Sequence, residues 1–183
     1  MFIDRLPRPF LDEMRALLGE SEYERYLAAM EETPLSGLRV NSLKTSNERL
    51  TATFGNLDPV LWTKNGFYCE TGGEYTSHPY YYAGLYYMQE PSAMSSAALL
   101  GAEPGEHILD LWAAPGGKST QIAADLRGEG FLLSNDLSAS RARALLKNIE
   151  LMGIGNCCIS CEDSDKLKRE YPLYFDRILV DAP

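Results

Sequence analysis

The second half of the chain alternates between short apolar runs and longer segments with helical spacing. The apolar runs at residues 107–112, 130–135, 157–161 and 175–180 predict four strands, and the amphipathic segments 119–126 and 139–152 predict helices between them. Strands that alternate with helices form parallel sheets with right-handed crossovers. The pattern therefore predicts an α/β fold in which ligands bind at the carboxyl ends of the strands.

The first half of the chain follows another pattern. Residues 4–32 have helical spacing interrupted at Gly19 and predict two helices, whereas LRVNSL at residues 38–43 alternates like a strand. A helix capped by Ser46 or Asn47 is predicted to run through Phe54.

Aromatic residues and glycines fill residues 61–88, which predicts short strands and turns, and residues 91–100 predict a helix that ends at Gly101. Packing is the simpler interpretation of this aromatic segment, and a platform for stacking nucleobases is the alternative. We expect residues 1–101 to form a small N-terminal α/β subdomain and residues 102–183 to form the first half of a larger α/β domain.

The composition gives an expectation for the cellular location of the protein. No apolar run is long enough to span a membrane, and four cysteines, three of them within five positions, do not make a disulfide framework. We therefore expect a reduced, cytoplasmic location and no membrane partner. Cys157, Cys158 and Cys161 fall in a predicted buried strand and are interpreted as core residues, and a metal site formed by them would lack a fourth ligand.

The net charge of −9 is unfavourable for nucleic-acid binding, because phosphate contacts require Lys and Arg. Two basic clusters are interpreted as solvated faces: Arg39, Lys44 and Arg49, and Arg141, Arg143 and Lys147.

The stretch from His107 to Ser119, HILDLWAAPGGKS, reads as a buried strand, a tight loop and the start of a helix. Backbone N–H groups collect without partners at such a corner, and Gly116 and Gly117 let the backbone approach a small polar ligand closely. The loop is not the G-x-G-x-x-G of a dinucleotide site. Gly117-Lys118-Ser119 matches the end of a phosphate-binding loop, but Trp112 occupies the position of its first glycine. A nucleotide hydrolase is thus a minor alternative.

Three acids follow the ends of the predicted strands: Asp136, Asp163 and Asp181. Asp136 lies 18 residues beyond Lys118, where an α/β nucleotide site places the carboxylate that accepts both ribose hydroxyls. Asp163 is placed to accept an exocyclic amine of a base, and Asp181 ends the fourth strand beside the cleft. Any one of them alone would be read as a helix or turn cap. Together with the loop they predict a nucleotide-like ligand.

These motifs carry a resemblance to a known family. LDLWAAPGGKST, NDLSASRA, the Asp163 corner and VDAP resemble the Nop2/Sun family of RNA cytosine-5 methyltransferases. LPRPFLDEMRALLGE, GLRVNSLK and YYAGLYYMQEPSAM are similar to the N-terminal region of its bacterial ribosomal-RNA members. The resemblance implies a Rossmann-like class I methyltransferase sheet, S-adenosylmethionine as cofactor and RNA, most simply ribosomal RNA, as substrate.

The resemblance also implies roles for individual residues. Asp136 would hold the ribose hydroxyls with Arg141 nearby, Asp163 would meet the adenine amine, and Asp181 would lie between the cofactor and the target base. The loop around the methionine part of the cofactor would be Trp112, Ala113, Ala114, Pro115, Gly116, Gly117 and Lys118. Many members have Cys where this chain has Trp112.

The family attacks cytosine C6 with a cysteine thiolate to activate C5. Its two cysteines lie immediately after a DAP such as residues 181–183 and in the next strand region, so the resemblance implies no catalytic residue in the sequence given. We therefore expect this chain alone to be inactive, and a non-catalytic module that binds S-adenosylmethionine or RNA is the alternative function. The family sheet has seven strands and four are predicted here, so the fourth is expected to be an exposed edge that pairs with a second copy in a homodimer.

Overall fold

The computed structural model describes residues 3–55 and 57–182. By its internal contacts the chain divides into two compact units, Met1–Leu35 and Ser36–Pro183, which are described separately. The domain boundary between residues 101 and 102 remains a prediction.

The first unit is helical. A short 3-10 turn, η1 (Ile3–Arg5), precedes α1 (Arg8–Glu31), and Gly19 interrupts α1 with φ 72° and ψ 165°. The guanidinium of Arg15 lies 4.8 Å from the centre of the Tyr23 ring, so the segments on either side of Gly19 contact each other. The two predicted helices are therefore confirmed as two helical segments that break at Gly19.

The second unit begins with a small antiparallel sheet, in which β1 (Ser36–Val40) lies between β2 (Gly66–Cys69) and β3 (Tyr86–Met88). Its connections contain α2 (Asn47–Phe54), η2 (Glu74–Thr76) and α3 (Pro79–Tyr82). Of the two predicted caps, Ser46 is the one that caps α2, by accepting the N–H of Arg49, while Asn47 is the first residue of the helix. One face of the sheet packs with Leu50 of α2 in a core of Leu38, Val40, Leu50, Phe67, Cys69 and Tyr86.

The aromatic segment contributes to this core, because the ring of Phe54 packs edge-on against Tyr86 with 5.5 Å between their centres. Tyr75 and Tyr81 also pack against it. Packing therefore explains these tyrosines.

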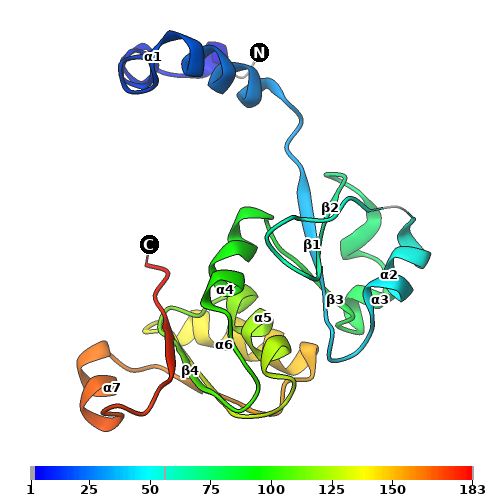
Figure 1. Cartoon of the computed structure of the whole chain (residues 1–183), viewed down its shortest axis with the longest axis vertical. Coiled ribbons are helices and arrows are strands. Elements are labelled where there is room, and N and C mark those ends of the chain that lie inside the picture. The colour runs from blue at the N-terminus through cyan, green and yellow to red at the C-terminus, as the bar shows by residue number, and fades with distance from the viewer. Residues whose placement is uncertain (1–2, 56, 183) are drawn as a thin grey trace. The chain divides into compact units, whose positions relative to one another are not determined.

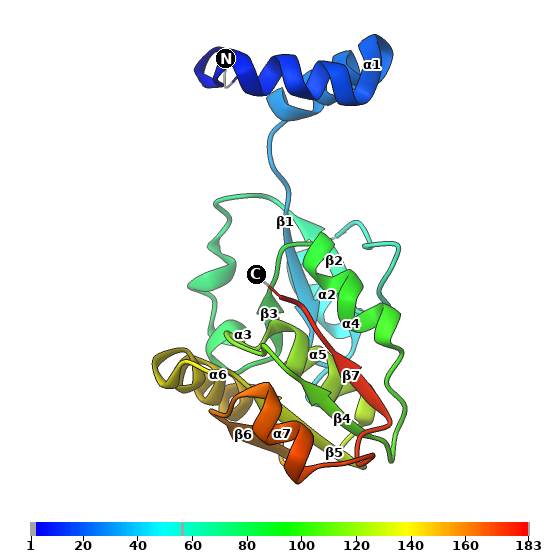
Figure 2. The ribbon, with the colours of Figure 1, turned by 90° about the vertical axis from the view of Figure 1, so that its left-hand side faces the viewer.

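The larger sheet follows η3 (Ser92–Met94) and α4 (Ser95–Leu100), which ends at Gly101 with φ 63°. Within the described residues its four parallel strands run in the order β6 (Cys157–Ser160), β5 (Phe131–Asn135), β4 (His107–Asp110) and β7 (Arg177–Leu179). The helices α5 (Gly117–Leu126), α6 (Ala139–Met152) and α7 (Ser164–Glu170) connect them (Figures 1 and 2). The predicted parallel α/β sheet is confirmed.

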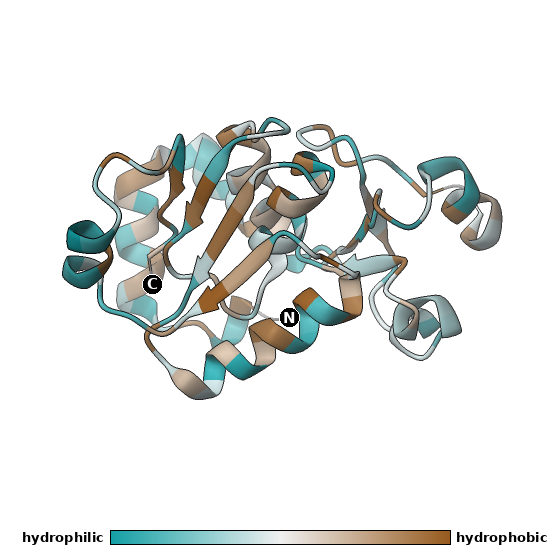
Figure 3. Ribbon diagram, turned by 90° about the horizontal axis from the view of Figure 1, so that it is seen from below, coloured by the Kyte–Doolittle hydropathy of each residue, from teal (hydrophilic) through white to brown (hydrophobic). Residues whose placement is uncertain are grey.

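Alternate strand residues face two different cores. Ile108 and Leu132 pack with α4 and α5, whereas Leu109 and Leu133 pack with Leu167 of α7. In Figure 3 the strands of this sheet are largely brown, while α7 is mostly teal. Leu167 is the buried residue of α7 and belongs to the same apolar cluster as Leu109 and Leu133. A sheet covered on both faces fits near-continuous apolar strands.

The prediction that the cysteine-rich strand is buried is wrong for two residues. Cys158 and Cys161 are exposed and Cys157 is half-buried, because β6 is an edge strand of the sheet. Cys158 lies opposite Leu133, but α7 packs on Leu109 and Leu133 and leaves the edge uncovered. All four cysteines lie in the described part of the chain, and none forms a disulfide there.

Candidate functional site

The loop between β4 and α5 ends at Gly116, whose φ of 114° is unfavourable for residues with a Cβ. A Cβ at Gly116 would lie 3.0 Å from Cδ1 of Leu145 on α6, so a side chain there would also require Leu145 to shift. Gly116 is the N-cap of α5 and supplies no side-chain hydrogen bond. The first N–H groups of α5 are therefore free of a side-chain cap, and such a helix N-terminus favours an anionic group.

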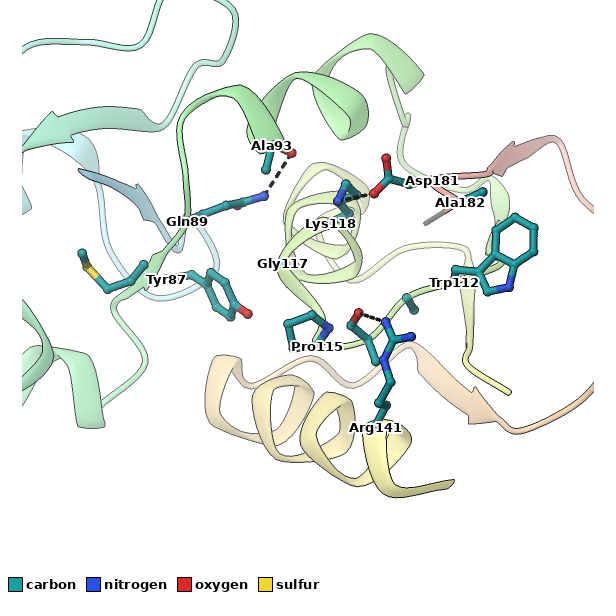
Figure 4. A pocket seen from close by; sticks show the side chains of 13 residues that line it. Tyr87, Gln89, Ala93, Trp112, Pro115, Gly117, Lys118, Arg141, Asp181 and Ala182 are labelled. Atoms are coloured by element: carbon teal, nitrogen blue, oxygen red, sulfur yellow. Dashed lines mark hydrogen bonds and ion pairs between the residues drawn. The ribbon is translucent and has the colours of Figure 1, made fainter. Parts of the chain in front are cut away.

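A pocket of about 370 Å³ lies beside this helix start, within the usual size range of small-molecule sites. It is formed by the end of β3, the loop after β4, the start of α5, Arg141 of α6 and the residues after β7 (Figure 4). The lining residues are Tyr87, Met88, Gln89, Ala93, Trp112, Ala113, Ala114, Pro115, Gly117, Lys118, Arg141, Asp181 and Ala182. Of the predicted site residues, the pocket thus brings together Arg141, Asp181 and all of the loop 112–118 except Gly116. Gly116, Asp136 and Asp163 do not line this pocket.

An ion pair crosses one side of the pocket. Nζ of Lys118 lies 2.6 Å from Oδ2 of Asp181, and Figure 4 shows the two side chains pointing toward each other. Lys118 comes from α5 and Asp181 follows β7, so the pair connects the predicted loop with the end of the fourth strand.

Asp136 is buried behind the loop, directly after β5. Its Oδ1 accepts the N–H of Ser138 at 3.0 Å, while its Oδ2 is buried and accepts no hydrogen bond from a described residue. Nη2 of Arg141 is 3.4 Å from that Oδ2 and donates to the carbonyl oxygen of Ala114 at 2.9 Å. Arg141 therefore links the loop to a carboxylate that retains capacity to accept a hydrogen bond.

Asp163 is exposed and acts as the N-cap of α7, where its Oδ1 accepts the N–H of Lys166 at 2.8 Å. Asn135 holds this corner in place, because its Nδ2 donates to the carbonyl oxygens of Leu111 and Glu162 at 3.2 and 2.9 Å. A single buried side chain thus joins the ends of β4, β5 and β6. Sequence reasoning missed Asn135, although a polar residue ending an apolar strand is a readable signal.

Sequence reasoning also missed Asp110, which ends β4 inside an apolar run. Asp110 is fully buried, and its Oδ2 accepts the hydroxyl of Ser119 at 2.6 Å, while its Oδ1 accepts no hydrogen bond from a described residue. Ser119 in turn accepts the hydroxyl of Ser134 at 2.9 Å. Burial raises the pKa of Asp110 to about 6.

The solvated interpretation of the first basic cluster is wrong for Arg39. Arg39 is buried and donates to Oε1 of Gln89 at 3.0 Å, to the carbonyl oxygen of Gly117 at 3.0 Å and to Oγ1 of Thr120 at 2.7 Å. Burial lowers the pKa of Arg39 to about 10, which still leaves it charged at neutral pH. A buried guanidinium therefore fastens β1 to the start of α5.

Lys44 of the same cluster also has a structural contact, because its Nζ donates to the carbonyl oxygens of Leu151 and Ala83 at 2.7 and 2.9 Å. Lys44 thus provides a hydrogen-bond donor for a carbonyl oxygen in the last turn of α6, while Arg49 is exposed as expected.

Among the described residues no helix is long and apolar enough to cross a membrane.

Comparisons with known proteins identify two matched regions. Residues 6–91 match a family model described as the N-terminal domain of 16S rRNA methyltransferase RsmF, and residues 97–183 match one described as 16S rRNA methyltransferase RsmB/F. The chain is 39% identical to ribosomal RNA small subunit methyltransferase F of Escherichia coli O157:H7 and 39% identical to that of Citrobacter koseri. Each alignment covers 97% of this chain and 39% of the relative, so the chain spans about two fifths of the length of these relatives.

A solved structure is also similar to this chain. A methyltransferase homolog from Pyrococcus horikoshii superposes with a TM-score of 0.78 at 32% identity, over 97% of this chain and 64% of that one. The Rossmann-like methyltransferase fold is therefore confirmed for this sheet. With both of its regions matched by models of one group of enzymes, the chain belongs to the RsmB/F family of 16S rRNA methyltransferases.

Proposed function

We propose that this chain binds S-adenosylmethionine in the pocket beside residues 112–118, and that the whole protein methylates C5 of a cytosine in ribosomal RNA. The observation that carries the proposal is the uncapped start of α5 beside a buried, incompletely hydrogen-bonded Asp136, in a chain of this family. The activity belongs to the whole protein, because the chain spans about two fifths of its relatives.

The residues present fit the chemical groups of this cofactor. Its carboxylate suits the N–H groups at the start of α5, which no side chain caps, and its ribose hydroxyls suit the carboxylate of Asp136, whose Oδ2 accepts no hydrogen bond from a described residue and lies 3.4 Å from Nη2 of Arg141. Asp163 at the end of β6 is proposed to accept the adenine amine, and Asp181 to lie between cofactor and base. When bound, the cofactor supplies an electrophilic methyl group.

A nucleotide hydrolase is a weaker candidate on this geometry. A phosphate-binding loop uses the hydroxyl after its Lys to hold Mg²⁺, but the hydroxyl of Ser119 is buried and donates to Asp110. Lys118 is paired with Asp181, and Trp112 lines the pocket at the position of the first glycine. A module that binds the cofactor or RNA without catalysis is the second candidate, and the binding geometry serves it equally well.

Calorimetry with S-adenosylhomocysteine and ATP tests the proposal. S-adenosylhomocysteine should bind, and Asp136→Ala should weaken binding by roughly 10- to 100-fold, as expected when hydrogen bonds to a charged group are lost. Asp165→Ala, at an exposed position of α7, is the matched control and should bind normally. Binding of ATP without S-adenosylhomocysteine would favour the hydrolase instead. Cofactor binding without methyl transfer by the whole protein would favour the non-catalytic module.

We also propose that the edge strand β7 pairs with a second copy in a homodimer. Ile178 of β7 and Val180 just after it are 52% and 56% exposed, and an exposed apolar strand edge is prone to pair with another strand. A monomeric mass by light scattering at high protein concentration would rule this pairing out. Ribosomal RNA as substrate also places the proposed activity in the cytoplasm.

A further inference from the structure

A second pocket, of about 320 Å³, shares no lining residue with the first. It lies between the loop before β2, the chain after α4 and one face of α5. The residues used below are Arg39, Trp62, Lys64, Gln121 and Asp125, all of which line it.

Two buried polar atoms on its lining residues have no hydrogen-bond partner among the described residues: Nη1 of Arg39 and Oε1 of Gln121. The two side chains belong to residues that are only 1% and 4% exposed. The other atoms of both groups are occupied, because Arg39 donates through Nε and Nη2 and Gln121 donates through Nε2 to the carbonyl oxygen of Met94 at 3.0 Å. Since a buried polar atom without a partner is destabilising, a donor and an acceptor left open beside one cavity point to a polar ligand.

Asp125 adds a second acceptor one helical turn from Gln121, on the same face of α5. Burial raises the pKa of Asp125, and the positive charges of Arg39, Lys64 and Arg127 act in the opposite direction, so Asp125 lies within electrostatic reach of all three. No ion pair joins Asp125 to Arg39 among the described residues, although both residues line this pocket.

Trp62 supplies a flat apolar surface at the rim. Its indole Nε1 donates to the carbonyl oxygen of Pro91 at 2.8 Å, which fixes the orientation of the ring, and the residue is still 43% exposed. A nucleobase stacks well on such a ring.

We propose that this second pocket binds one guanine nucleotide, and its proposed source, the RNA substrate, rests on the proposed function above. The groups proposed to read the base are one donor, Nη1 of Arg39, and two acceptors, Oε1 of Gln121 and the carboxylate of Asp125, while Thr63, Asn65 and Glu103 also line the pocket. Guanine is the complement, with O6 as acceptor and N1–H and N2–H₂ as donors, whereas cytosine offers one donor and two acceptors. Lys64, which is exposed, is placed to meet the phosphate, and Trp62 to stack on the base.

The test is titration of the chain with guanosine and inosine 5′-monophosphates, which differ only in the N2 amino group. The guanosine nucleotide should bind about tenfold more tightly, the effect of one hydrogen bond to a charged acceptor. Asp125→Asn, which keeps a neutral acceptor but loses the charge, should reduce this preference to about two- to threefold, and Asp165→Asn should leave it unchanged. Lys64→Ala at the surface should weaken binding of the nucleotide but not of guanosine, which gives a second variant if Asp125→Asn fails to fold.

A matched pair of short oligouridines, carrying one central guanine or one inosine, identifies the source. Guanine-dependent binding of the oligonucleotide assigns the pocket to an RNA strand, and guanine-dependent binding of the mononucleotide alone assigns it to a free nucleotide. Three results would overturn the inference: equal binding of the guanine and inosine compounds, a guanine preference that Asp125→Asn leaves unchanged while Lys64→Ala does not weaken nucleotide binding, or no binding at all. S-adenosylhomocysteine titrated into the same samples reports on the first pocket, so the proposed function and the second site can fail separately.

Discussion

Two carboxylates near the first pocket differ in their burial and in their hydrogen-bond partners. Asp181 is exposed and is neutralised by Lys118, whereas Asp110 is fully buried with one oxygen that accepts no hydrogen bond from a described residue. A buried carboxylate with a single hydroxyl donor is destabilised in its charged form. The buried acid beneath the loop therefore makes folding stability depend on pH.

The pKa of Asp110 is raised from 3.8 to about 6 in the folded chain, so the folded state binds the proton more tightly than the unfolded state. Its contribution to stability is present at low pH and is lost as pH rises through about 6. Asp110→Asn removes this titration. The free energy of unfolding of the variant, relative to the natural chain, should therefore increase by about 2 kcal/mol between pH 4.5 and 7.5. Urea denaturation at the two pH values measures it, and a difference that does not change with pH would contradict it.

Helices and strands were predictable where local signals agree. The predicted helix at residues 139–152 is α6 to the residue, because its apolar spacing ends at Gly153, which adopts φ 75°. Burial of β6 was not predictable, because it depends on the strand order β6-β5-β4-β7 and not on the composition of the strand itself. The local sequence thus predicts whether a segment forms a helix or a strand, but its burial depends on the elements that pack beside it.

At the start of α7, Asp163 has two roles, because it caps this helix and is also proposed to hold the adenine amine. Asp163→Ala should destabilise the chain by about 1 kcal/mol through loss of the cap, whereas Asp163→Ser should keep it. Both variants should weaken binding of S-adenosylhomocysteine. If Asp163→Ser binds as tightly as the natural chain, Asp163 is only a cap.

Within the second compact unit, the small and large sheets are joined by a few polar side chains. Arg39 reaches Gly117 and Thr120, while Nδ2 of Asn41 donates to the carbonyl oxygens of Gly84 and Met152 at 2.8 and 2.9 Å. Such contacts between residues far apart in sequence leave no local signature, which is why Arg39 reads as a solvated charge in the sequence. The first pocket was predictable because most of its loop is one contiguous motif, and the second was not, because its residues come from separate segments.

The central claim is that the whole protein methylates C5 of a cytosine in ribosomal RNA with S-adenosylmethionine. Nucleoside mass spectrometry of small-subunit ribosomal RNA, compared between cells with the intact gene and cells with the gene disrupted, tests it directly. We predict that 5-methylcytidine is lost from one position on disruption and returns when the intact gene is restored, but not when the gene carries Asp136→Ala. Unchanged 5-methylcytidine in the disrupted strain would contradict the account.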